Sequence, residues 1–62
     1  MYRIVWVSPE NPNAIKATGH EDIPTIEQAI RYRGIAVEEA KIINDGLDWF
    51  PRIQKVEYTF VD

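Results

Sequence analysis

The chain has no cysteine, a single histidine and no apolar run that approaches the length of a membrane span. Without cysteine no disulfide can stabilise the fold, and the lack fits a reducing, cytoplasmic compartment. One histidine leaves too few ligands for a zinc site, so we expect neither a metal nor a cofactor. Crossing a bilayer takes about 20 apolar residues, so we expect no membrane span, and the apolar run after Met1 is too short for a signal peptide.

Surplus positive charge is also lacking. Seven lysines and arginines stand against ten aspartates and glutamates, which gives a net charge of −3 at pH 7. Domains that bind nucleic acid normally carry a basic face, so this balance argues against that role. The length of 62 residues predicts one small domain, residues 1–62.

Three segments have the composition or the alternation of β-strands. Tyr2–Val7 is rich in β-branched and aromatic residues. Ser8–Asn13 holds two prolines and predicts a surface loop, after which Ala14–His20 predicts a thin strand suited to a sheet edge. Gln54–Val61 alternates apolar and polar residues and predicts the last strand. In the first strand, three alternate residues are expected to face the core: Tyr2, Ile4 and Trp6.

Thr25–Phe50 is the segment with the helical spacing of apolar residues. Thr25 and Gln28 fit a capping box, so a helix should begin there, with Ile23 tucked beneath it. The expected core-facing stripe consists of Ile26, Ala29 and Ile30, and in an unbroken helix it continues through Val37, Ala40 and Leu47.

Gly34 decides whether this segment forms two helices or one. A glycine after Arg33 suits a left-handed C-cap, so we expect a break near Gly34 and a second helix that ends at Asn44–Gly46. The alternative is one unbroken helix. It would expose Ile35 and Ile42 opposite the core and indicate a partner surface.

The fold class expected from these elements is α+β. The hairpin and the last strand form a three-stranded antiparallel sheet, and the helices pack on one face of it. The other face is more apolar around Val5 and Val7 than a bare surface should be. A second copy could cover that face, or a strand of another protein could add to an exposed edge.

Two aromatic residues in the return loop, Trp49 and Phe50, are the strongest candidates for function. They are either core residues or anchors for another protein, because aromatic residues and arginine dominate binding hot spots. We therefore predict a protein-binding site with Trp49 and Phe50 as anchors and Arg31 and Arg33 as surrounding charges. The partner is another protein, with a second copy of the chain among the candidates.

The alternative is nucleic-acid binding, as in a small transcription-related protein. Arg31, Tyr32, Arg33 and Lys41 form the one basic and aromatic cluster, which could contact phosphates and stack on a base. The acidic pair Glu38–Glu39 nearby would repel phosphates, so we rank this alternative second.

Catalytic chemistry has little support in the sequence. His20–Asp22 holds a histidine beside two carboxylates, but neighbouring residues of an extended chain point to opposite sides, so a solvated loop is the simpler interpretation. Ser8 is the one serine and has no identifiable base. We do not expect an enzyme.

The order strand, strand, helix, strand in about sixty residues resembles that of small phage-encoded proteins that bind and inhibit a host enzyme, and of several short uncharacterised bacterial proteins. The resemblance lies in size and layout, so it transfers no functional residue. It implies a phage or mobile-element origin and a role as an inhibitor or modulator of a host protein.

Overall fold

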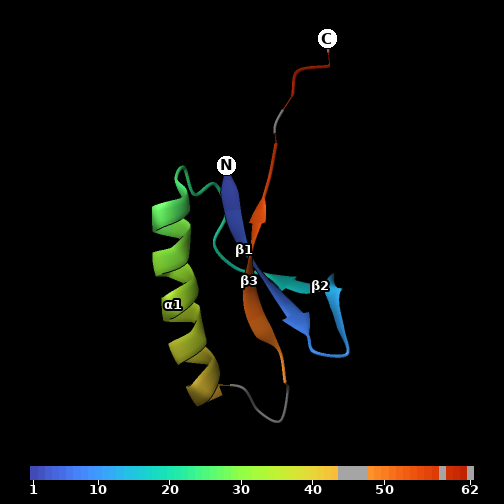
Figure 1. The fold of residues 1–62 in the computed structure, drawn as a ribbon, viewed down its shortest axis with the longest axis vertical. Coiled ribbons are helices and arrows are strands. Elements are labelled where there is room, and N and C mark those ends of the chain that lie inside the picture. Colours follow the sequence, from blue (N-terminus) through green and yellow to red (C-terminus); the bar gives the residue numbers. More distant parts are fainter. Residues whose placement is uncertain (44–47, 58, 62) are drawn as a thin grey trace.

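The computed structural model describes residues 1–43, 48–57 and 59–61. Its elements follow the order β1 (Tyr2–Ser8), β2 (Asn11–Thr18), α1 (Ile26–Ile43) and β3 (Phe50–Lys55) (Figure 1). Both β2 and β3 pair antiparallel with β1, which gives the strand order β2-β1-β3. Helix α1 packs on one face of this sheet, against β1 and β3. The structure therefore confirms the α+β class and the three-stranded antiparallel sheet.

The predicted break near Gly34 is wrong, because α1 runs unbroken from Ile26 to Ile43. Buried Ala29 and Ala36 stand on either side of Gly34, so both halves of the helix are held on the sheet. A glycine in a helix interior costs about 1 kcal/mol relative to alanine, which this packing outweighs. No heavy atom beyond the local helix backbone lies within 4 Å of the place where a Cβ of Gly34 would be.

Helix α1 begins as the sequence predicts. The backbone N–H of Gln28 donates to the Oγ1 of Thr25 at 3.2 Å, which is the bond expected of an N-cap threonine. Glu27 in the first turn and Lys41 in the last turn both suit the helix dipole. The predicted end at Asn44–Gly46, like Leu47, lies outside the described residues.

The core lies between α1 and the sheet. Ile4, Ile23, Ala29 and Ala36 are buried there, and the predicted inward face of the first strand is confirmed. Three partly buried residues pack against this cluster: Tyr2, Trp6 and Ile53. The helix differs from prediction, because small alanines allow α1 to approach the sheet closely and leave its larger side chains at the sides. Residues expected in the core stripe but found exposed are Ile26, Ile30 and Val37.

Two strand boundaries differ from the sequence prediction. β2 already begins at Asn11, because a hairpin turn at residues 9–10 is enough to reverse the chain, and Pro12 is tolerated in an edge strand with register shifts. β3 covers Phe50–Lys55 in place of Gln54–Val61. Its ladder with β1 ends where Lys55 lies opposite Tyr2, so the alternating residues beyond it have no strand of β1 beside them.

Candidate protein-binding surface

The outer edge of β3 carries backbone groups that face away from the sheet. The N–H of Val56 donates to the carbonyl of Met1 at 2.8 Å, so the backbone N–H and C=O groups of even-numbered residues in β3 point toward β1. The backbone groups of the odd-numbered residues point outward, away from β1: those of Pro51, Ile53 and Lys55. In the part of the chain that the structure describes, no strand lies on that side. Pro51 fits here because the N–H that proline lacks would have pointed to the empty side.

One side of α1 lies above this edge. Tyr32 stacks on His20, with ring centroids 4.6 Å apart, and the carbonyl of His20 accepts from Ile4 on the β2 side of β1. The Tyr32 side of α1 therefore faces β2, and the opposite side faces the outer edge of β3. Ile26, Ile30 and Val37 share that opposite side, since they are spaced four and seven residues apart. We call these three residues the α1 flank.

The three residues of the α1 flank are apolar yet exposed, with 51% of Ile30 accessible to solvent. The exposed Arg33 lies among them, since it is three residues after Ile30 and four before Val37. Gly34 borders the α1 flank and adds no side chain. An apolar helix side above an unpaired strand edge is the environment that a further strand would fill, because such a strand buries one face against the helix and bonds its backbone to the edge.

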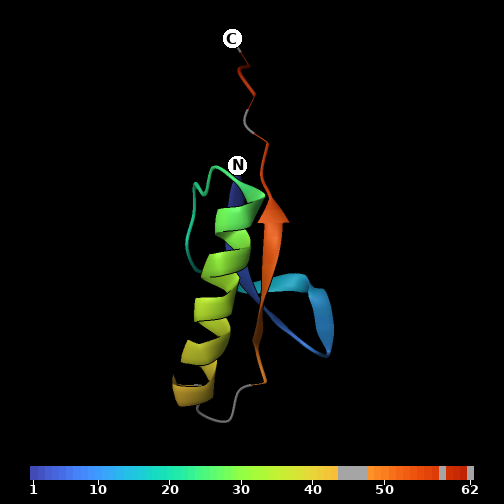
Figure 2. The same ribbon diagram turned by 60° about the vertical axis from the view of Figure 1, so that its left-hand side comes forward.

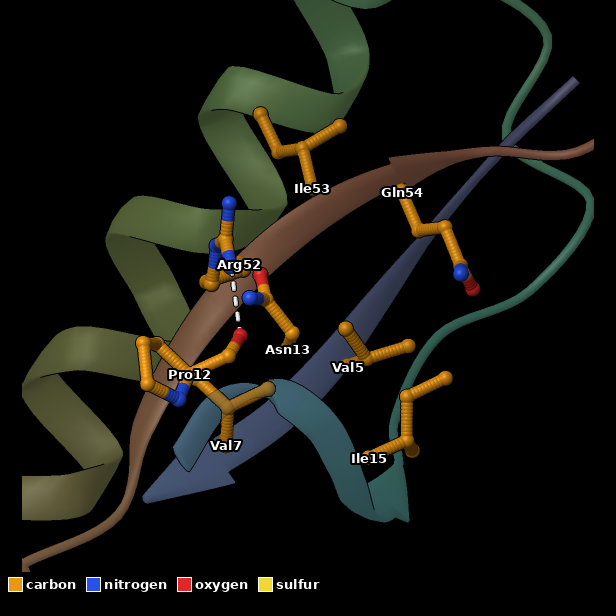
Figure 3. Close-up of a pocket in the computed structure, with 8 residues that line it drawn as sticks. All are labelled: Val5, Val7, Pro12, Asn13, Ile15, Arg52, Ile53 and Gln54. Atoms are coloured by element: carbon orange, nitrogen blue, oxygen red, sulfur yellow. Dashed lines mark hydrogen bonds between the residues drawn. The ribbon is translucent and has the colours of Figure 1, made fainter. Parts of the chain in front are cut away.

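The face of the sheet away from α1 holds a groove of about 220 Å³ (Figure 3). Val5 and Val7 form its floor and are buried, although α1 lies on the other face. The start of β2 curls over this face, and the Nη1 of Arg52 donates to the carbonyl of Pro12 across the groove. Among the described residues Arg52 forms no ion pair, so its guanidinium can still pair with an acid or lie against an aromatic ring.

The predicted anchor residues lie at the start of β3. Phe50 pairs with Val7, is 37% exposed, and by strand alternation shares the groove face with Arg52. Trp49 directly precedes the strand and is half-buried. Neither residue belongs to the hydrophobic core cluster. Arg31 and Arg33 are exposed on α1, which packs on the opposite face of the sheet, so the structure does not bring them together with Phe50.

The residues of the nucleic-acid hypothesis do not form one basic surface. Arg31, Tyr32 and Arg33 are consecutive in a helix, so each points about 100° away from the one before it. The Tyr32 ring packs on His20, and the Nζ of Lys41 bonds Glu38 Oε1 at 3.2 Å.

The unbroken helix also exposes Ile35 and Ile42, as expected for that alternative. Ile35 is 48% and Ile42 is 85% exposed, on the side of α1 away from the sheet. They lack an adjacent strand edge. They therefore give a useful contrast to the α1 flank.

Comparisons with protein-family models, with curated proteins and with solved structures found no match. Within residues 1–43, 48–57 and 59–61, no helix has the length and apolar character to cross a membrane. In the same residues, no three histidine or acidic side chains gather as metal ligands would.

Of the residues at this candidate surface, the sequence analysis proposed Phe50 and did not propose Arg52 or the α1 flank. Arg52 was not proposed because Pro51 beside it indicated a loop. The direction of a side chain cannot be predicted from the sequence of a loop. The α1 flank was assigned to the core because an apolar stripe says nothing about which of its residues approach the sheet. The one available signal was the pair of alanines, Ala29 and Ala36, seven residues apart on one side of the helix.

Proposed function

We propose that this chain is a non-catalytic protein-binding module that takes an extended segment of another protein along the outer edge of β3. The observation that carries the proposal is the coincidence of the outer β3 edge, which no described strand pairs with, and the exposed α1 flank beside it. Backbone hydrogen bonds to Ile53 and Lys55 would supply affinity, and side-chain contacts on the two faces would supply specificity.

The two faces of the edge favour different side chains in the ligand. On the helix face, alternate residues of the added strand would meet Ile30 and Val37, which favours aliphatic side chains. On the groove face, they would meet Phe50 and the guanidinium of Arg52, which favours aromatic or acidic side chains. The preferred ligand is therefore an extended segment that alternates aliphatic residues with aromatic or acidic ones.

The class of target follows from the resemblance in size and layout to small phage-encoded inhibitors. A host protein with an exposed extended segment is the target class that we favour, and the absence of cysteine fits action in the cytoplasm. Covering such a segment would change the activity of the host protein without any chemistry in this chain.

The test selects extended peptides from a displayed library and measures their affinity by fluorescence anisotropy. Selected peptides should alternate aliphatic with aromatic or acidic residues. Ile30→Lys should weaken their binding at least tenfold, because it places a charge where the added strand must pack. Phe50→Ala should weaken it by about 1 kcal/mol or more, as is typical of an aromatic contact at an interface.

Ile35→Lys is the matched control. It changes an isoleucine of nearly equal exposure on the same helix, away from β3, and should leave the affinity unchanged. If both lysine variants weaken binding equally, the peptide binds the outer side of α1 and the β3 edge is not the site. If selection yields only sequences that bind Arg31, the proposal is likewise wrong.

A further inference from the structure

The segment after β3 has the sequence of a strand but lies outside the sheet. Residues 56–60 alternate apolar and polar side chains in the sequence. After Val56, whose N–H still donates to the carbonyl of Met1, the chain leaves the sheet in both views (Figures 1 and 2). Phe60 is 98% and Val61 is 97% exposed. An alternating segment with large apolar residues normally packs one side against a covered face.

The accessible surface area of the chain also indicates that it exposes more surface than an average monomer of its mass. Its accessible surface is 4851 Å² for a mass of 7.2 kDa, whereas an average monomer of that mass exposes roughly 4,100 Å². Two copies that each covered this surplus would bury about 1,500 Å², which lies within the range of about 1,200–2,000 Å² for specific interfaces.

We propose that residues 56–61 of a second copy add antiparallel to the outer edge of β3, and that two copies exchange these segments around a twofold axis at Val56. The inference rests on the proposed function, because it names the first occupant of the same edge. Each copy then contributes residues 56–61 as a strand and receives the same segment from the other copy. The outer edge of β3 is therefore paired in both copies.

Charge selects the register of this pairing. With the twofold axis at Val56, Lys55 of one copy lies opposite Glu57 of the other, which is a favourable cross-strand pair. Moving the axis to residue 55 would place two Lys55 side chains opposite each other, and moving it to residue 57 would do the same for Glu57. The axis at Val56 avoids both like-charge pairs.

The same register satisfies the outward backbone groups. Ile53 pairs with Thr59 of the second copy, and each N–H donates to the carbonyl of the other. Pro51 lies opposite Val61 of the second copy, where the proline carbonyl can accept although it has no N–H to give.

The side chains of the added segment also find partners. Phe60 of the second copy lies opposite Arg52, beside the groove, where its ring can contact the guanidinium that donates to the carbonyl of Pro12. Val61 of the second copy lies on the helix face, beneath the α1 flank. Glu57 and Thr59 of the second copy share this helix face, so Val61 is the residue of the added segment that brings an apolar side chain to α1.

A single introduced thiol tests the register, because the chain has no cysteine of its own. Residues at position 56 would face each other as a non-hydrogen-bonded antiparallel pair, with Cα atoms about 4.5 Å apart, which is within the range of about 4.4–6.8 Å for disulfides. Under mild oxidation Val56→Cys should form covalent dimers at least tenfold more efficiently than Gln28→Cys, a control on the exposed side of α1.

A second substitution separates strand pairing from chance collision. Thr59→Pro removes the N–H that would bond Ile53 of the other copy, so it should reduce crosslinking of Val56→Cys at least tenfold. Circular dichroism should show an unchanged fold, since residue 59 lies outside β3. Sedimentation of the unmodified chain should show a monomer–dimer equilibrium that Thr59→Pro shifts to monomer.

Binding of selected peptides by the same samples distinguishes failure of this inference from failure of the proposed function. A monomer that still binds peptides at the β3 edge overturns the exchange and leaves the function standing. A monomer that binds no peptide overturns both. A dimer that crosslinks through Asn13→Cys on β2 more efficiently than through Val56→Cys also overturns the exchange.

Discussion

The two edges of the sheet are built differently, although both belong to strands that pair with β1. The β2 edge carries Pro12 and Lys16, and its pairing with β1 shifts register twice. These are the devices by which proteins prevent another strand from adding to an edge. The β3 edge also carries a proline and a lysine, Pro51 and Lys55, but its register is regular over six residue pairs and the α1 flank lies beside it. The two edges therefore differ in the regularity of their pairing with β1 and in the α1 flank, and the proposed function depends on that difference.

The largest effect on the free energy of unfolding should come from Ile4 in the core, and Ile30 in the α1 flank is the comparison. Ile4→Ala removes a fully buried side chain and should lower the free energy of unfolding by about 2 to 5 kcal/mol. Ile30→Ala changes an exposed residue of the α1 flank and should cost less than about 1 kcal/mol. Urea unfolding at low protein concentration measures both, and equal losses would show that the flank belongs to the core.

Removal of the N-cap of α1 should lower the free energy of unfolding by a smaller amount, and this loss should not depend on the β2 or β3 edge. Thr25→Ala removes the oxygen that accepts from Gln28 and should lower stability by about 1 kcal/mol. Thr25→Ser keeps the oxygen and serves as the control. A loss below about 0.3 kcal/mol would mean that water replaces the cap without cost.

The effect of Gly34→Ala should have the opposite sign. A Cβ at this position meets no atom outside the local helix, and alanine is the better helix former, so the monomer should gain about 0.5 to 1 kcal/mol. Thermal unfolding at low concentration measures the gain. A loss of stability would show that Gly34 relieves strain in α1 that its helical geometry does not reveal.

The smallest effect should come from the charge pair on α1. Lys41→Ala removes the bond to Glu38, which is an exposed pair three residues apart, and should cost only about 0.2 to 0.5 kcal/mol. The cost should fall in high salt, because salt screens exposed charges. A cost above about 1 kcal/mol would place Lys41 in a tighter role than the structure shows.

The sequence predicted the features that local rules determine. Thr25 with Gln28 located the start of the helix, and the alternation of Tyr2, Ile4 and Trp6 identified the inward face of β1. Both depend on residues close in the chain. Gly34 misled the prediction because a glycine signals a cap locally, whereas the packing of Ala29 and Ala36 on a distant sheet decides whether the helix continues.

The candidate surface was harder to predict because it depends on where strands end. The alternation in Gln54–Val61 was read as one strand, and the structure divides that segment at Lys55, where the ladder with β1 stops. That division leaves residues beyond Lys55 without β1 beside them, whereas the outer edge of β3 is open because no described strand lies beyond it. No spacing within the segment itself reveals it.

The most direct test is amide hydrogen exchange along β3, measured by NMR at low and high protein concentration. In the monomer, Ile53 and Lys55 should exchange quickly because their N–H groups face outward, while Arg52 and Gln54 should be protected by β1. At high concentration, or with a selected peptide, Ile53 and Lys55 should become protected at least tenfold while the β2 edge stays unchanged. Protection that appears on β2, or unchanged exchange at Ile53 when a partner is bound, would contradict the account.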